Sequence, residues 1–169
     1  MNKWYVVQTK PRDEQRAEVE LANQGFTVYL PKIIVEKKKS NKIQKVLEPL
    51  FPRYLFVQLD YTHDDSYTIR STRGVGKGLL LFGETPAVVP DEIIADIRVI
   101  CQNSTAHPKP LYQQGDTLLV KEGPFKGLIG VLEKINEAST GEARVLVLIE
   151  LLGKIQRLTF PVNQVTLAN

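Results

Sequence analysis

The sequence is poor in the residues that build metal sites and nucleophilic catalytic sites. Its 169 residues include one cysteine and two histidines, Cys101, His63 and His107. A single cysteine excludes an internal disulfide framework, and these three side chains are too few for a zinc site. The chain also lacks the glycine-rich loop with a Lys-Ser/Thr pair that cradles phosphates. We therefore predict no metal, no cofactor and no enzymatic activity.

Long hydrophobic runs are missing as well. No apolar stretch approaches the roughly 20 residues that a membrane-spanning helix needs. The apolar stretch near the N-terminus, residues 4–7, is too short for the core of a signal peptide. We therefore expect a cytoplasmic protein without a membrane partner.

The chain has only a small excess of positive charge, and this excess is unevenly distributed along the sequence. Lys and Arg number 22 against 19 Asp and Glu, whereas residues 32–53 alone carry seven positive and two negative side chains. Apolar residues on both sides of residues 36–42 predict a β-hairpin with a basic tip. Two interpretations stay open, a tip that contacts nucleic-acid phosphates and a solvated hairpin that resists aggregation. The first would use Lys37, Lys38 and Lys39.

The chain is predicted to divide at residues 101–114, which are polar, contain two prolines and lack apolar periodicity. Residues 1–100 mix β-branched stretches with amphipathic segments, which predicts an α+β sandwich. A helix is expected to begin near Pro11 and to end before Gly25. We expect a second helix at residues 90–100 and strands at residues 4–9, 26–30, 54–59 and 68–71.

The remaining residues, 115–169, allow two interpretations. Five short β-branched or leucine-rich stretches separated by turns predict a small β-barrel. The same apolar residues also recur at helical spacing on both sides of residues 136–141, which would give an α-helical hairpin. Gly127 and Gly130 disfavour an isolated helix, so a helical form would need a partner surface. Both interpretations stay open at this point.

Several motifs resemble those of a known family. Residues 4–7, 48–57 and 72–75 resemble the N-terminal domain of NusG-type transcription elongation factors. Residues 115–116 and 122–127 resemble their C-terminal KOW domain, and the two blocks occur in the family's order. The sequences EPLFP at residue 48 and TRG at residue 72 look most like the specialised paralogue RfaH. The KOW residues that carry the resemblance are Gly123, Pro124, Phe125 and Gly127.

The resemblance implies a monomeric factor that binds RNA polymerase and suppresses pausing and termination. The residues implied to bind the β′ clamp helices through an exposed apolar patch are Phe51, Tyr54, Phe56, Ile94 and Ile97. Those implied to face the β gate loop are Asp65, Ser66 and Tyr67. Those implied to touch the non-template DNA strand are Lys10, Arg16, Thr72 and Arg73. The KOW barrel is implied to recruit a small-subunit ribosomal protein or Rho.

The resemblance to RfaH also implies a closed state, in which the C-terminal domain packs as a helical hairpin on the N-terminal domain. Glu48 and Arg144 match an ion pair between the domains of that state. Asp13, Glu20 and Asn23 stand where RfaH carries neutral or basic DNA-facing residues, so a different recruitment element is implied. Two alternatives remain: a general NusG-type factor with a permanent barrel, and a KOW-containing RNA-binding or translation protein.

Overall fold

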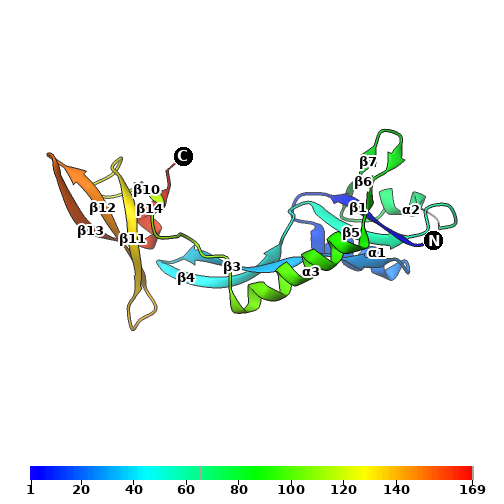
Figure 1. The fold of residues 1–169 in the computed structure, drawn as a ribbon, viewed down its shortest axis with the longest axis horizontal. Helices are drawn as coiled ribbons and strands as arrows, with labels where there is room; N and C mark the ends of the chain where they lie inside the picture. Colours follow the sequence, from blue (N-terminus) through cyan, green and yellow to red (C-terminus); the bar gives the residue numbers. More distant parts are fainter. Residues whose placement is uncertain (65, 169) are drawn as a thin grey trace. The chain divides into compact units, whose positions relative to one another are not determined.

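The computed structural model describes residues 1–64 and 66–168 and contains two compact units (Figure 1). The N-terminal unit comprises Met1–Ile33 and Leu47–His107. The C-terminal unit comprises Ile34–Val46 and Pro108–Asn169. The division therefore differs from a single cut in the sequence, because the tip of the basic hairpin groups with residues that follow the linker. None of the described helices is long and apolar enough to cross a membrane.

An antiparallel sheet forms the centre of the N-terminal unit. Its strands follow the order β2-β5-β1-β6, and a further strand, β9, also pairs with β1. The strands are β1 (Lys3–Thr9), β2 (Thr27–Tyr29), β5 (Tyr54–Leu59), β6 (Val75–Leu79) and β9 (Val88–Val89). Strands β1 and β5 pair from Lys3 opposite Leu59 to Gln8 opposite Tyr54. This register aligns two largely apolar segments of the unit.

Helices cover both faces of this sheet. Because alternate side chains of a strand point to opposite faces, neighbouring residues of β1 pack against different helices. Tyr5 and Val7 of β1 pack with Ala17 and Leu21 of α1 (Glu14–Asn23). On the other face, the core under α3 (Asp91–Ala106) consists of Trp4, Phe56, Ile94 and Ile97. The predicted α+β class is confirmed by this arrangement.

Two local predictions in the N-terminal unit are wrong. Residues 68–71, expected as a strand, fall in a short helix, α2 (Tyr67–Arg70), whose Ile69 is buried in the core. Helix α3 continues to Ala106 instead of ending at residue 100. The polar residues after Cys101 suggested a linker, but the Ser104 hydroxyl donates a 2.7 Å hydrogen bond to the Cys101 carbonyl within the helix. The helix ends just before Pro108, since a proline disfavours helical backbone at the residue that precedes it.

The predicted basic hairpin is present as β3 (Lys32–Lys39) and β4 (Lys42–Pro49). Its two-residue turn has Ser40 at φ 52° and Asn41 at φ 59°. Positive φ at both central positions is typical of the type I′ turn, which suits the twist of the flanking strands. A second small hairpin in the N-terminal unit joins β7 (Leu81–Phe82) and β8 (Thr85–Pro86).

The C-terminal unit contains an antiparallel sheet of five strands in the order β13-β12-β11-β10-β14. The strands are β10 (Thr117–Val120), β11 (Ile129–Glu137), β12 (Ala143–Leu151), β13 (Lys154–Pro161) and β14 (Val165–Leu167). Their core includes Leu118, Leu132, Val147 and Phe160. The strand interpretation thus describes this structure, and the helical hairpin does not occur in it. Some of the apolar residues that recur at helical spacing point away from the core of the sheet and are exposed. Ile155, for example, is 72% exposed.

Candidate interaction surfaces

The loop at residues 72–75 packs closely on the start of α1. Gly74 has φ +88°, and a Cβ added there would lie 2.7 Å from the Ala17 amide nitrogen. The Lys10 amide donates a 2.8 Å hydrogen bond to the Gly74 carbonyl. The loop therefore carries Arg73 beside Lys10, and both side chains are exposed. Arg16, also exposed, projects from α1.

Thr72 has a role inside the fold that the sequence did not predict. Its side chain is buried, with 7% exposure. The Thr72 hydroxyl accepts a 2.7 Å hydrogen bond from the Gln24 amide and donates a 2.6 Å bond to the Thr68 carbonyl. These bonds tie the ends of α1 and α2 to the loop. Thr72 therefore positions Arg73, while its own hydroxyl is occupied in the interior.

Glu14 is a second positioning residue that the sequence analysis missed. Its carboxylate is buried and accepts a 2.9 Å hydrogen bond from the Arg53 amide. Arg53 has φ 74°, and its carbonyl accepts a 2.7 Å bond from the Thr9 amide. The turn that precedes β5 is thereby held against the start of α1. The only signal in the sequence was an acidic residue in the first turn of a helix, which is common on purely electrostatic grounds.

The apolar patch expected to bind polymerase is largely covered. Phe56, Ile94 and Ile97 have exposures of 6%, 3% and 6%, so the expectation that they are exposed is wrong. The reason is that α3 lies directly on the face of β5 from which Phe56 projects. Phe51 remains 39% exposed and packs edge-on against Phe56, with ring centroids 6.2 Å apart. Tyr54 is half-buried.

The outer face of this region still offers apolar side chains. On α3, Ile93 is 46% exposed and Ile100 is 52% exposed. Tyr29 of β2 contacts the same helix. The Arg98 guanidinium lies 4.1 Å from the centroid of the Tyr29 ring, and the Tyr29 hydroxyl donates a hydrogen bond to the Cys101 thiol at 3.7 Å. Burial, followed by the bond to Cys101, raises the pKa of Tyr29 to about 12. The phenol therefore stays protonated and acts as a structural link between β2 and α3.

Of the residues expected to face the gate loop, Ser66 and Tyr67 lie at the start of α2. Ser66 is half-buried, Tyr67 is 90% exposed, and Asp65 lies outside the described residues. A hollow of about 540 Å³ adjoins them. Its lining includes Tyr61, Ser66, Tyr67, Arg70, Lys77 and Leu81. Aromatic and cationic side chains thus surround one open depression.

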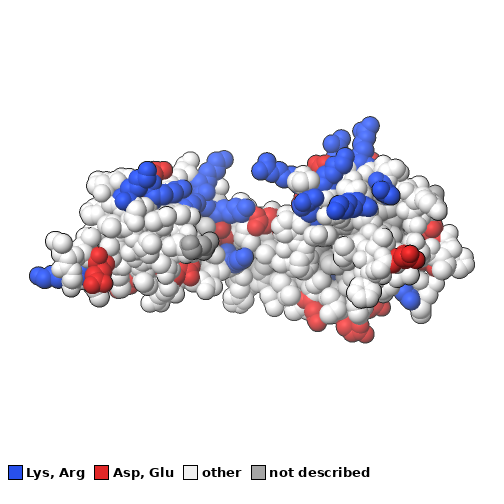
Figure 2. Space-filling view, turned by 90° about the horizontal axis from the view of Figure 1, so that it is seen from above, with Lys and Arg blue, Asp and Glu red and all other residues white. Residues whose placement is uncertain are grey.

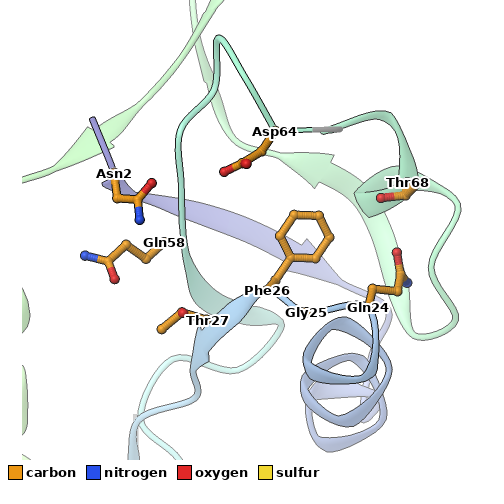
Figure 3. A pocket seen from close by; sticks show the side chains of 8 residues that line it. All are labelled: Asn2, Gln24, Gly25, Phe26, Thr27, Gln58, Asp64 and Thr68. Atoms are coloured by element: carbon orange, nitrogen blue, oxygen red, sulfur yellow. The ribbon is translucent and has the colours of Figure 1, made fainter.

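A second hollow, of about 630 Å³, opens beside β2. Figure 3 shows the Phe26 ring at its centre, with Asn2 and Gln58 on one side and Gln24 and Thr68 on the other. No cysteine or histidine occurs among its described lining residues. Amides, hydroxyls and one carboxylate offer hydrogen bonds but no activated nucleophile. Among the described residues there is also no group of three or more His, Cys, Asp or Glu side chains arranged to hold a metal.

Basic side chains are concentrated on part of the surface. Figure 2 shows that most Lys and Arg side chains of the N-terminal unit on the visible face gather along one edge, apart from most of the acidic ones. At the hairpin tip, Lys37 and Lys39 are exposed, whereas the side chain between them, Lys38, is half-buried. The three lysines that the sequence grouped together therefore have different environments.

The KOW residues form the turn between β10 and β11. Gly123 and Gly127 have φ values of +85° and +94°, which only glycine adopts readily. The Gly127 amide donates a 2.7 Å hydrogen bond to the Val120 carbonyl, and the Phe125 ring packs edge-on against Phe160 at 6.0 Å. Pro124 occupies the exposed turn. This motif therefore forms a tight turn and places the Phe125 ring against the C-terminal core.

Glu48 and Arg144, the two residues expected to pair between domains, belong to different units. Arg144 lies on β12 with its guanidinium 3.8 Å from the Glu142 carboxylate. Both side chains are substantially exposed, so this contact contributes at most about 1 kcal/mol. Glu48 lies in β4 and is half-buried.

Comparison with known proteins identifies the family. A family model described as "Transcription termination factor nusG" matches residues 2–98. The NusG protein of Rickettsia bellii is 26% identical over 172 residues, which cover 96% of this chain and 88% of that protein. The NusG protein of Halalkalibacterium halodurans is 31% identical over 144 residues, covering 78% of this chain and 81% of that protein. Both relatives are named transcription termination/antitermination proteins.

A solved structure of Thermotoga maritima NusG covers 100% of this chain and 98% of its own, at 20% identity and a TM-score of 0.39. The family match includes every strand of the N-terminal sheet and both helices, α1 and α2, that support the 72–75 loop. It therefore covers the unit that an RNA-binding or translation protein with only a KOW domain would lack. The chain belongs to the NusG family, whose members are transcription factors and not enzymes.

Proposed function

We propose that this chain is a transcription termination/antitermination factor that binds RNA polymerase through its N-terminal unit. The observation that carries the proposal is the family match over residues 2–98, which spans the sheet and the exposed Phe51. Phe51 and Tyr54 precede and begin β5, and the Glu14 carboxylate holds the turn between them in place. A partner can thus dock on a surface that is already ordered, which lowers the entropic cost of binding. We propose the β′ clamp helices as that partner and the cytoplasm as the site of action.

Replacing Phe51 by Ala should weaken binding to isolated β′ clamp helices by roughly tenfold or more, because an exposed aromatic at an interface contributes most of its area to the complex. Tyr54→Ala should act in the same direction. Isothermal titration calorimetry measures both. Val19→Ala is the matched control, since Val19 is an apolar residue of α1 that is 49% exposed and belongs to neither core cluster of the N-terminal unit. Unchanged affinity of both variants, with unchanged thermal unfolding, would contradict this assignment.

We further propose that basic side chains on and around the 72–75 loop contact the exposed non-template DNA strand. Lys10 and Arg73 are exposed neighbours joined through the Gly74 carbonyl, so their positive charges reinforce each other. Arg16 belongs to the same proposed contact surface, and Thr72 supports it from inside the fold. Lysine and arginine supply phosphate contacts that are independent of sequence and sensitive to salt.

Lys10→Gln and Arg73→Gln should each weaken single-stranded DNA binding and reduce the salt slope of log K by about 0.7, the value for one phosphate contact on a single strand. Fluorescence anisotropy at several salt concentrations gives both quantities. Lys134→Gln in β11 of the C-terminal unit removes the same charge elsewhere and should leave the slope unchanged. A slope that falls equally in all three variants would show a general charge effect and would overturn the assignment.

The finer assignments follow from the same proposal. Ser66 and Tyr67, beside the hollow at α2, are proposed to face the β gate loop. The C-terminal unit is proposed to recruit a small-subunit ribosomal protein or Rho. Two kinds of factor fit this proposal. The first is a specialised factor of the RfaH type, with a DNA recruitment element and a Glu48–Arg144 pair in a closed state. The second is a general NusG-type factor with a permanent barrel, and the formation of all five C-terminal strands favours it.

A further inference from the structure

The tip of the basic hairpin is built into the C-terminal unit, although it lies about 70 residues earlier in the sequence than that unit's other strands. The Lys38 ammonium donates a 2.8 Å hydrogen bond to the Tyr112 hydroxyl and a 3.4 Å bond to the Val162 carbonyl. It also donates to the Val165 carbonyl. An ammonium group has three hydrogens, and here each has an acceptor.

The acceptors of this site are themselves ordered. The Tyr112 side chain is 7% exposed, and its hydroxyl donates a 3.3 Å hydrogen bond to the Val165 carbonyl. The hydroxyl therefore accepts from Lys38 and donates to Val165 at the same time. Val162 and Val165 are fully buried at the two ends of the short helical turn that precedes β14. Their backbone positions are fixed by the core on which they pack.

The site is unusual because it neutralises no charge. Among the described residues, no carboxylate forms an ion pair with Lys38. Burial lowers the pKa of Lys38 below its ordinary value, which is the expected cost of removing an ammonium from water. Neutral oxygens offset that cost only if their geometry is good. A lysine at the tip of a solvated hairpin would have no reason to adopt this position.

Independent contacts place the hairpin around Lys38. The Asn41 carbonyl accepts a 2.6 Å hydrogen bond from the Ala143 amide, and its side-chain oxygen accepts a 3.2 Å bond from the Asn163 amide. The type I′ turn presents both groups to the C-terminal unit. Ile43 from β4 packs against the C-terminal core. The turn is therefore bound by main-chain, side-chain and apolar contacts at once.

The segment after α3 fastens the other strand of the hairpin. The Glu36 amide donates to the Lys109 carbonyl at 2.8 Å, and the Lys109 amide donates to the Ile34 carbonyl at 3.0 Å. The Glu36 carboxylate accepts a 3.1 Å bond from the Leu111 amide. Residues 109–111 thus add a short parallel pairing beside β3 and lead directly to Tyr112.

We propose that the C-terminal unit contains an ammonium-binding site, formed by the Tyr112 hydroxyl and the Val162 and Val165 carbonyls, whose ligand is Lys38 of the β3–β4 hairpin. The tip of the hairpin, residues 34–46, is then held within the C-terminal unit by this site. Lys38 serves this contact, and of the three consecutive lysines it is the one withheld from phosphate binding while the hairpin is docked. Lys39 on the same strand points to solvent.

The test uses the full chain and hydrogen exchange of individual amides. Lys38→Met keeps the aliphatic stem and removes the ammonium, and Tyr112→Phe keeps the ring and removes the hydroxyl. Each should accelerate exchange at the Ala143 and Asn163 amides by roughly tenfold, the size of one lost hydrogen bond to a charged group. Because both variants break the same bond, the double variant should be no faster than about the quicker single variant. Lys39→Met is the matched control and should exchange as the parent chain does.

A measurement on the unaltered chain keeps the proposal open to refutation if the variants unfold. A docked ammonium with three acceptors exchanges its protons slowly, so one lysine Nζ signal should persist in a ¹⁵N spectrum at neutral pH and vanish in Lys38→Met. Absence of any such signal would overturn the proposal. Equal amide exchange in Lys38→Met and Lys39→Met, or strictly additive effects of Lys38→Met and Tyr112→Phe, would overturn it as well.

Discussion

Gly130→Ala is expected to lower the free energy of unfolding of the C-terminal strands by about 1–3 kcal/mol or more. A Cβ at this position would lie 2.5 Å from Val147 Cγ1, 2.6 Å from Ile149 Cγ1 and 2.6 Å from the Leu148 carbonyl oxygen. The two side chains belong to the fully buried core, and the carbonyl belongs to the adjacent strand β12. None of these atoms is the end of a flexible side chain, so the sheet itself would have to shift.

The same substitution acts in the opposite direction on a helix. Alanine is more favourable than glycine in a helix interior by about 1 kcal/mol. Gly130→Ala therefore separates the two interpretations of residues 115–169. In a chain that can form the helical hairpin, the far-ultraviolet circular dichroism of the full protein should gain helical signal. In a chain with permanent strands, thermal unfolding should shift to lower temperature with no gain of helix.

Ile129→Ala is the control for this experiment. Ile129 precedes Gly130 on β11 and is 56% exposed, so its truncation removes little buried area. Its effect on unfolding should stay within about 0.5–1 kcal/mol, since it leaves no core cavity. If Gly130→Ala unfolded at the same temperature as Ile129→Ala and gained no helix, the close packing of β11 on β12 would not limit stability.

Gly74→Ala is the second substitution with a large expected effect. Gly74 has φ +88°, and an added Cβ would lie 2.7 Å from the Ala17 nitrogen and 3.1 Å from the Asp13 carbonyl oxygen. The unfavourable backbone conformation costs about 1–3 kcal/mol. The contact with α1 adds an overpacking cost of similar size, because helix backbone cannot move aside. Urea unfolding should show the sum as a lower midpoint.

Gly25→Ala separates the two causes. Gly25 has φ +94°, but an added Cβ would meet no atom within 4 Å. It therefore carries the backbone cost without the contact. We expect Gly74→Ala to unfold at a clearly lower urea concentration than Gly25→Ala, and to weaken single-stranded DNA binding because the loop displaces Arg73. Equal midpoints for the two variants would mean that the loop does not press on α1.

The sequence by itself determined the order of the elements and much of their type. The β-branched and aromatic residues of segments 4–9 and 54–59 predicted the two central strands, since such side chains fit a half-buried pleated surface. Apolar segments on both sides of residues 36–42 predicted the basic hairpin, and turn residues between short apolar stretches predicted the chain reversals within residues 115–169. The motifs also led to the NusG family, which the match over residues 2–98 supports. These signals are local, because each depends on residue types within a short stretch of sequence and not on contacts with distant residues.

Other features depended on which surfaces the folded chain covers. Alternation places Phe56 opposite its neighbours, but it does not say that α3 will cover that face and bury Ile94 and Ile97 with it. Helical and strand spacing coincide in the short apolar runs of residues 125–158, so periodicity left two folds open. Packing decides between them here, because Gly130 fits the strands without space for a Cβ.

The basic tip illustrates the same limit for charge. Three consecutive lysines look alike in the sequence, and their summed charge suggested one surface. The strand turns the middle side chain to the opposite face, where the Tyr112 hydroxyl and two carbonyls from residues far along the chain receive it. Only the tertiary structure could assign Lys38 to that site, because its acceptors are mostly main-chain oxygens, which every sequence contains and only a fold brings together.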